Sequence, residues 1–308
     1  MNLQGVNYRV GIDKTVIGLS YPNVTEAQLK LLDESKVNKL KQMQNTFVAA
    51  KMHLINMIEC TENFVKITNY KFLTRYLIKA NDGTIACEVY LGKTGKTHVI
   101  NIQFNPSKIT RLGKAEFDSL LAVSFNHHYS EIYNQGRVSH IELNVDILDI
   151  DMSEYQLIDL GRRKLTNVDT TQYNGRRNSS RVMASYDKAK QLGTDDSIWR
   201  FEIRMKDRSR TVKEFIANPP SNPFLDFVLI KKSDLQSIAQ ESGFPLLRQT
   251  IKKNGFYGAV KNKAARDNIS KRIRNKRANF WDVELFWEEL RKELCNLSPN
   301  VFFKGTYT

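Results

Sequence analysis

The sequence has few cysteines, and their arrangement argues against two common small scaffolds. Cys60, Cys87 and Cys295 are odd in number, lie far apart and include no Cys-x-x-Cys pair. Disulfide frameworks need paired cysteines, and structural zinc sites need closely spaced ligands. The pattern therefore favours reduced thiols in a cytoplasmic protein.

Long apolar runs are also missing. A membrane span needs about 20 predominantly apolar residues, whereas charge interrupts the apolar stretches here, as in Ile55-Asn56-Met57-Ile58-Glu59. The first five residues show neither the basic start nor the apolar run of a secretion signal. We therefore expect no membrane partner. With 41% hydrophobic residues, the 308-residue chain can build one large core or two modest ones.

Acidic residues are fewer than basic ones. The chain has 47 Lys and Arg against 33 Asp and Glu, a net charge of +14, and such a field attracts polyanions, above all nucleic acid. Between Ile251 and Arg277 ten basic residues accompany one acid, Asp267, and ten minus one is +9. This cluster predicts contacts with DNA phosphates, although a merely soluble basic protein would also be cationic. Its members are Lys252, Lys253, Lys261, Lys263, Arg266, Lys271, Arg272, Arg274, Lys276 and Arg277.

Alternation of apolar and polar residues predicts mostly strands before Pro219-Pro220 and mostly helices after it. The predicted strands cover 8–21, 64–80, 85–91, 97–104, 138–147, 181–188 and 198–205, and a predicted helix covers 114–132. The fold class is therefore α+β. We predict a unit built on a central antiparallel sheet over 1–218, and a smaller, basic, mainly helical DNA-binding region over 219–308.

One predicted strand gathers polar side chains on a single face. Because side chains alternate along a strand, one face is apolar, with Ile141, Leu143 and Val145. The other face carries an imidazole, an amide and two carboxylates, from His140, Glu142, Asn144 and Asp146. Carboxylate and amide oxygens are the ligands that Mg²⁺ and Mn²⁺ prefer. A polar face turned to solvent is the commoner arrangement, so this strand alone does not predict a metal site.

A second strand carries Arg200, Glu202 and Arg204 on the face opposite Phe201 and Ile203. If it lies beside the first strand, Glu202 joins the two carboxylates there. Carboxylates held close together repel unless a cation neutralises them, so such a cluster implies a metal ion or a raised pKa. The alternative is cross-strand salt bridging by the two arginines.

A third strand places Tyr186 and Lys188 on one side. A phenol is a weak nucleophile at its usual pKa of about 10. A neighbouring ammonium group and a metal ion would each favour the phenolate. An enzyme that must hold one DNA end covalently can use such a tyrosine. An ordinary half-buried strand tyrosine is the alternative.

Five sequence features lie in order within residues 102–205, about a third of the chain. They are Ile102-Gln103-Phe104-Asn105-Pro106-Ser107-Lys108, the strand His140 to Asp146, Thr171-Gln172-Tyr173-Asn174-Gly175-Arg176-Arg177, Tyr186-Asp187-Lys188-Ala189-Lys190-Gln191-Leu192-Gly193, and Trp199-Arg200-Phe201-Glu202. In this order, the five stretches resemble the replication initiation factor family of rolling-circle plasmids and phages. They are also similar to the replication endonucleases of filamentous phages.

The resemblance implies a central antiparallel sheet related to the HUH (His-hydrophobic-His) endonucleases and a divalent metal, Mg²⁺ or Mn²⁺. It implies that Tyr186 is the nucleophile and Lys188 its helper, with Tyr173 in reserve. It assigns metal binding to the carboxylates of Glu142, Asp146 and Glu202. On the polar face of the first strand, Asn144 could add a ligand, and His140 could either bind the metal ion or orient a phosphate.

The sequence departs from the family pattern in two places. The family often has Asp where this chain has Glu142, and often has Arg where it has Ala184. The first change keeps the charge and lengthens the reach, whereas the second replaces a cationic residue near the tyrosine with a neutral one. The chain also contains no His-x-His pair.

We therefore predict nicking and rejoining of origin DNA through a 5′-phosphotyrosyl link. The basic region would recognise the duplex, and four arginines of the sheet would contact the strand: Arg176, Arg177, Arg200 and Arg204. The resemblance also implies that the protein recruits a host helicase. Whether the protein is a monomer or a homodimer stays open, as does whether it belongs to a plasmid or a phage. The alternatives are a DNA-binding initiator or repressor without catalysis, and an RNA-binding sheet protein, which would expose aromatic residues on its strands.

Overall fold

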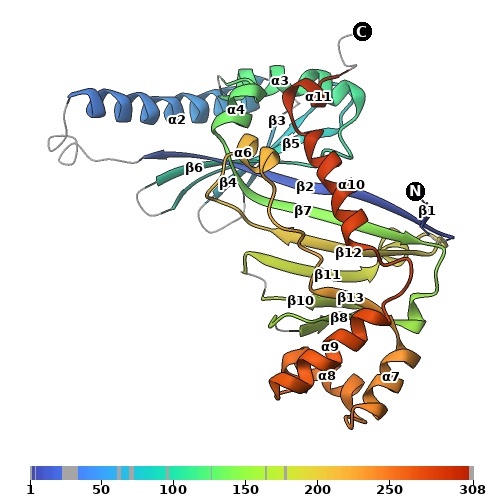
Figure 1. Cartoon of the computed structure of the whole chain (residues 1–308). Helices are drawn as coiled ribbons and strands as arrows, with labels where there is room; N and C mark the ends of the chain where they lie inside the picture. The colour runs from blue at the N-terminus through green and yellow to red at the C-terminus, as the bar shows by residue number, and fades with distance from the viewer. Residues whose placement is uncertain are drawn as a thin grey trace. The chain divides into compact units, whose positions relative to one another are not determined.

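The computed structural model describes residues 2–3, 5–22, 34–60, 64–68, 73–94, 97–125, 127–163, 165–176 and 179–304. The chain is α+β (Figure 1). It divides into two compact units. Unit 1 contains Met1–Gly11, Glu142–Met205 and Pro220–Glu293, and unit 2 contains Ile12–Ile141, Lys206–Pro219 and Leu294–Thr308. The division differs from a simple split at 218, because each unit collects segments that are distant in the sequence.

The sheet of unit 2 is a run of antiparallel neighbours in the order β3 (Phe64–Thr68), β4 (Leu73–Lys79), β5 (Ile85–Thr94), β6 (Thr97–Phe104) and β2 (Val6–Pro22). The predicted strand over 64–80 is thus two strands, and residues 69–72 between them lie outside the description. Alternation gives this sheet one buried apolar face, which includes Ile17, Ile100 and Ile102.

Helices cover that apolar face of unit 2. The predicted helix over 114–132 is two helices, α3 (Arg111–Phe125) and α4 (Tyr129–Gln135), accompanied by α2 (Glu34–Cys60), α6 (Val212–Ala217) and α11 (Pro299–Phe302). The break has a local cause, because Glu131 completes a capping box with His128 at the start of α4. Buried rings of Phe104, Phe117 and Phe302 join sheet and helices, with centroids 5.1 to 6.0 Å apart.

The larger sheet of unit 1 runs in the order β7 (Arg137–Leu148), β12 (Ile198–Met205), β11 (Arg181–Asp187), β10 (Thr171–Asn174) and β9 (Leu165–Val168). β1 (Asn2–Leu3) pairs with the start of β2, and α5 (Lys188–Leu192) follows β11 directly. Phe201 of β12 packs edge-on against Trp281, with ring centroids 4.6 Å apart. Trp281 in turn contacts Phe286 of α10 (Val283–Cys295), so this amphipathic helix covers the apolar face of the sheet.

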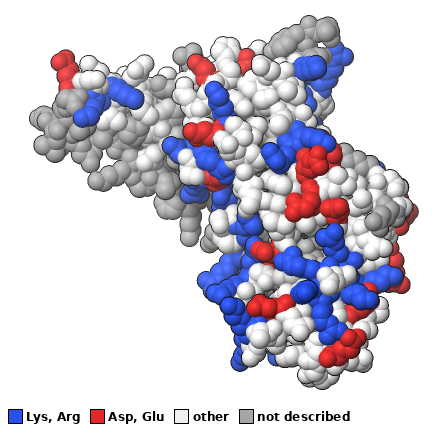
Figure 2. All heavy atoms as spheres, viewed as in Figure 1, with Lys and Arg blue, Asp and Glu red and all other residues white. Residues whose placement is uncertain are grey.

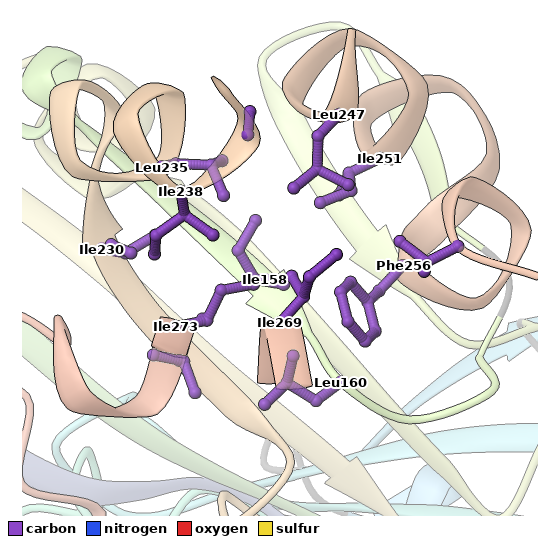
Figure 3. Close-up of a cluster of buried hydrophobic side chains, with 13 residues drawn as sticks. Ile158, Leu160, Ile230, Leu235, Ile238, Leu247, Ile251, Phe256, Ile269 and Ile273 are labelled. Carbon is purple, nitrogen blue, oxygen red and sulfur yellow. The ribbon is translucent and has the colours of Figure 1, made fainter. Parts of the chain in front are cut away.

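A second layer of unit 1 combines a two-stranded sheet with three helices (Figure 1). The strands are β8 (Tyr155–Asp159), which follows the short 3₁₀ helix η1 (Met152–Glu154), and β13 (Phe227–Lys231). The helices are α7 (Lys232–Glu241), α8 (Leu247–Ala259) and α9 (Lys263–Asn275). Their shared core includes Ile158, Ile230 and Ile273 (Figure 3). Helices α8 and α9, which carry most of the basic cluster, therefore share a core with Ile158 from the middle of the chain.

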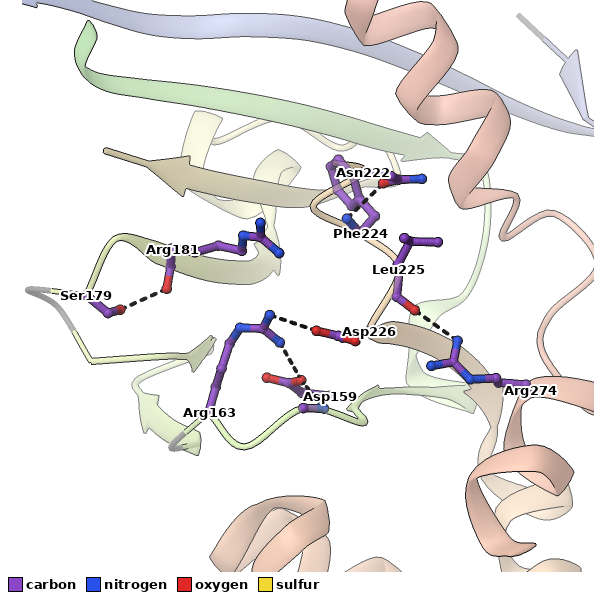
Figure 4. A network of polar contacts seen from close by, with 10 residues as sticks. Asp159, Arg163, Ser179, Arg181, Asn222, Phe224, Leu225, Asp226 and Arg274 are labelled. Atoms are coloured by element: carbon purple, nitrogen blue, oxygen red, sulfur yellow. Dashed lines mark hydrogen bonds and ion pairs between the residues drawn. The ribbon is translucent and has the colours of Figure 1, made fainter. Parts of the chain in front are cut away.

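Arg163 ties the two-stranded layer together through ion pairs (Figure 4). Its guanidinium lies 2.8 Å from carboxylate oxygens of both Asp159 and Asp226. The Oδ2 atom of Asp159 is buried and has no hydrogen-bond partner among the described residues. Burial raises the pKa of Asp159, and the attraction of Arg163 offsets only part of that rise. On the same layer, Arg274 of α9 donates to the Leu225 carbonyl at 2.9 Å.

Candidate functional site

Tyr186 lies on the same sheet face as the predicted carboxylates of unit 1. In the antiparallel pairing of β11 and β12, Tyr186 is opposite Arg200 and Ala184 is opposite Glu202, and residues directly opposite share a face. The Tyr186 side chain is half-buried, and its hydroxyl donates a hydrogen bond to Glu202 Oε2 at 3.1 Å. The expected convergence of phenol and acid is thus present for Glu202.

Glu202 connects Tyr186 to Arg204. Only 3% of Glu202 is exposed, and its second oxygen, Oε1, accepts from Arg204 Nε at 2.7 Å. The same Arg204 nitrogen is 3.6 Å from Glu142 Oε1. Burial acts to lower the pKa of Arg204, but the charges of Glu202 and Glu142 outweigh burial and raise it. The guanidinium therefore stays charged and compensates both acids.

Asp146 has a separate partner. Its two carboxylate oxygens accept from Nε and Nη2 of Arg200, both at 2.6 Å, and both residues are buried. A bidentate pair of this kind is strongly directional. Asp146 is therefore bound to Arg200 instead of joining Glu202, and the salt-bridge alternative weighed for Arg200 and Arg204 is the observed arrangement.

The arrangement of these acids does not fit a metal-ligand set as it stands. Within the described ranges, no three His, Cys, Asp or Glu side chains gather closely enough to hold a metal ion. Arg204 forms ion pairs with both Glu142 and Glu202, and Arg200 forms an ion pair with Asp146. Asn144 is buried on β7, while His140 lines a groove of unit 2. The Mg²⁺ or Mn²⁺ ion stays a prediction.

The placement predicted for Lys188 is wrong. β11 ends at Asp187, whose side chain accepts from the Lys190 backbone and caps α5, so Lys188 begins a helix. Its ammonium donates to Gln191 at 2.7 Å and lies 5.9 Å from the centre of the Tyr186 ring. Lys188 is thus beside the tyrosine ring, but not in line with Tyr186 along a strand.

Tyr173, the reserve nucleophile, shares the face with Tyr186. It lies opposite Ala184 on the paired strands β10 and β11, and Ala184 is opposite Glu202 on the next strand. The Arg204 guanidinium lies 5.9 Å from the centre of the Tyr173 ring. Both tyrosines therefore contact the same Glu202–Arg204 pair, one through its hydroxyl and the other through its ring.

The predicted DNA-binding residues separate into exposed and structural ones. Arg266 stacks on Tyr257 at 4.4 Å and donates to two backbone carbonyls, and Arg272 forms an ion pair with Glu241, so both support the fold. Arg176 is exposed after β10, whereas Arg177 lies outside the described residues. Figure 2 shows many Lys and Arg over the part of unit 1 that contains α8 and α9, with several Asp and Glu patches among them. The exposed members are Lys252, Lys253, Lys261, Lys263, Lys271, Arg274, Lys276 and Arg277, of which Arg274 also donates to the Leu225 carbonyl.

Sequence reasoning did not identify the direct contact between Tyr186 and Glu202. Glu202 was expected to bind a metal ion and Arg204 to bind DNA, whereas together they form one hydrogen-bonded pair beside the phenol. The Arg-x-Glu-x-Arg spacing contains the signal, because alternate residues of one strand face the same side. The pairing register that brings Tyr186 to this pair is a property of the folded sheet.

No protein-family model matches the chain, and no curated protein matches it. Among solved structures, it is similar to a rolling circle replication initiator protein from Geobacillus stearothermophilus, with 15% identity, 73% of this chain and 87% of that chain covered, and a TM-score of 0.38. Such a TM-score does not establish a common fold. Of the described helices, none is long and apolar enough to cross a membrane.

Proposed function

We propose that the chain is a rolling-circle replication initiator that nicks and rejoins one DNA strand, with Tyr186 as the nucleophile. The observation that carries the proposal is the 3.1 Å hydrogen bond from the Tyr186 hydroxyl to the buried carboxylate of Glu202. A phenol loses its proton poorly at neutral pH. A carboxylate within hydrogen-bond distance can accept that proton as the phenol attacks.

The reaction is a transesterification. The Tyr186 oxygen forms a bond to phosphorus, its proton passes to Glu202, and the bond from phosphorus to the 3′ oxygen breaks. The 3′ oxygen takes a proton from solvent, which leaves a 3′-OH primer and a 5′-phosphotyrosyl link. Because water does not attack phosphorus, the free energy of the broken phosphodiester bond is conserved in the phosphotyrosyl ester. The 3′-OH of a completed strand reverses the step and rejoins the DNA.

Arg204 and Lys188 would assist Tyr186 electrostatically. Arg204 forms an ion pair with Glu202, and 37% of its side chain is accessible to an incoming phosphate. The Lys188 ammonium near the phenol ring favours the developing phenolate. Arg200 is bound to Asp146 in a buried pair, so we assign it to holding the strands together.

Recognition of the origin is assigned to the exposed basic residues of α8 and α9. Lys and Arg side chains on phosphates supply affinity and position, while side chains that reach base edges supply specificity. Host helicase recruitment and a homodimer stay predictions, to be tested by pull-down and by sedimentation.

Nicking of supercoiled origin plasmid tests the proposal. Tyr186→Phe keeps the ring and removes the nucleophilic oxygen, so it should abolish nicking and the covalent protein–DNA adduct that survives detergent, while origin binding persists. Tyr173→Phe is the matched control on the same sheet face. If Tyr173→Phe is inactive and Tyr186→Phe still nicks, Tyr173 is the nucleophile.

A non-catalytic DNA-binding initiator or repressor is the second candidate. The observation that favours it is the pairing of the acids with arginines, since Asp146 and Glu202 then have purely structural explanations. The same plasmid assay separates the two, run with Mg²⁺, with Mn²⁺ and with a chelator. Specific origin binding without nicking under all three conditions would favour the non-catalytic protein. Nicking only with a metal ion would support the predicted cofactor.

A further inference from the structure

Unit 2 contains a groove of about 530 Å³ that the proposed chemistry does not use. β2, β6, the start of β7 and the segment after β12 line it, and it lies on the sheet face opposite the helices. On β2, Val16, Gly18 and Ser20 point into it, while the intervening Ile17 and Leu19 are buried on the other face. The groove is therefore a feature of the sheet itself.

The charge of the groove has a single sign. Four cationic side chains line it, from Lys14, Arg137, Lys206 and Arg208, together with His140. Of the described residues that form its walls, none carries a carboxylate. Asp207, between two of the cations in sequence, is bound by Arg210 at 2.6 Å. A groove with about four positive charges and no lining acid attracts a polyanion.

The sheet surface at the centre of the groove is recessed because the residues there are small. Gly18 lies next to Ser139, and a Cβ atom at Gly18 would be 2.4 Å from the Ser139 hydroxyl and 3.1 Å from Asn101 Oδ1. A side chain at position 18 would therefore force these neighbours apart and raise the floor. Asn101 and Gln103 of β6 add amide groups that can donate hydrogen bonds.

An aromatic side chain continues the same face beyond the groove. Tyr90 of β5 lies directly opposite Asn101 of β6, and Glu88 lies opposite Gln103. Glu88 is neutralised by Arg75 at 2.8 Å and accepts from the Tyr90 hydroxyl at 2.6 Å. The half-buried Tyr90 ring, with the Arg75 guanidinium 5.8 Å from its centre, resembles a platform on which a base can stack.

We propose that this groove binds the sugar-phosphate backbone of single-stranded DNA, with a base stacked on Tyr90. Proteins that bind single strands combine a cationic groove with aromatic side chains, and a duplex keeps its bases stacked on one another, away from such a platform. The choice of DNA rests on the proposed function. The site itself is independent of nicking, because every residue that forms it belongs to unit 2.

The salt dependence of binding tests the charge of the groove. A labelled 12-nucleotide oligothymidine is titrated by fluorescence anisotropy with the full chain carrying Tyr186→Phe, which removes nicking. Each phosphate contact contributes about 0.7 to the slope of log K against log salt for single strands. Combined Lys14→Gln, Lys206→Gln and Arg208→Gln should therefore reduce that slope by about 2.

A matched triple variant controls for net charge. Lys39→Gln, Lys41→Gln and Arg111→Gln remove the same charges from exposed helical positions of unit 2 and should leave the slope unchanged. Equal losses in the two triple variants would overturn the proposal. A duplex of the same sequence, or polyglutamate, competing as well as the oligothymidine would also overturn it, since the groove would then be a general anion surface.

Tyr90 tests the stacking component. Tyr90→Leu should weaken oligothymidine binding about tenfold, whereas Tyr90→Phe keeps the ring, loses only the hydrogen bond to Glu88 and should bind almost as tightly as the parent. Equal affinities for the Leu and Phe variants, with thermal melting confirming that both fold, would remove Tyr90 from the site. If the triple variant of the groove binds oligothymidine as tightly as its parent, while a chain that keeps Tyr186 nicks origin DNA, the groove is refuted and the nicking proposal is left intact.

Discussion

Replacing Glu202 by Gln is the perturbation that most sharply separates a catalytic acid from a structural one. Glutamine has nearly the same shape, so the Tyr186 hydroxyl can still donate to an amide oxygen where it now donates to Glu202 Oε2 at 3.1 Å. The amide is not a base, and the phenol proton must go to solvent. Positioned general bases contribute about 10²–10⁴-fold to rates, so single-turnover nicking should slow by about that factor.

The pH profile of Glu202→Gln identifies the cause of the loss. Without a base, the reaction depends on phenolate formed by hydroxide, so the rate should rise about tenfold per pH unit as long as the phenol is mostly protonated. Origin binding should stay within about threefold of wild type. A variant that nicks at the wild-type rate with the wild-type pH profile would show that Glu202 only supports Arg204, and the assigned base would be wrong.

Three further predictions concern stability, each measured by urea unfolding. Asp146→Asn leaves the buried Arg200 without its charged partner and should lower the free energy of unfolding by about 3–5 kcal/mol, whereas a loss below about 1 kcal/mol would show that solvent reaches this pair. Ile273→Ala opens a cavity in the core shared by β8, β13 and the basic helices and should cost about 2–5 kcal/mol, and an unchanged midpoint would contradict that shared core. Burial raises the pKa of Asp159, so the folded state holds this proton at higher pH than the unfolded state and loses stability as pH rises from about 4 through the raised pKa. Asp159→Asn removes that dependence, and a stability difference from wild type that is flat over this range would refute it.

The strands that carry the candidate site could be predicted from the sequence, but their mutual register could not. The strand predicted over 198–205 is β12, and that over 138–147 is β7 within one residue at each end, because each has one apolar and one polar face. Neither pattern contains information on which residue of a neighbouring strand lies opposite. The pairing of Asp146 with Arg200, and of Glu202 with both Tyr186 and Arg204, depends on that register.

The error at Lys188 had a signal in the sequence. Asp187 is a favourable N-cap residue, and Gly193 provides the left-handed C-cap, with φ of 68°. Reading these two residues as helix ends would have placed Lys188 in α5. By contrast, the strand Phe227–Lys231 is a short apolar run that fits a strand or a buried helix equally. Only its pairing with β8, from a distant part of the chain, decides between them.

The central claim is that the Tyr186 oxygen becomes joined to a DNA phosphate, and mapping the adduct tests it directly. The chain is incubated with origin DNA and Mg²⁺ or Mn²⁺, denatured, digested with nuclease and protease, and examined by mass spectrometry for a nucleotide-bearing peptide. We predict a 5′-phosphotyrosyl nucleotide on the peptide that contains Tyr186. An adduct on Tyr173, or nicked DNA with no protein attached, would contradict the claim.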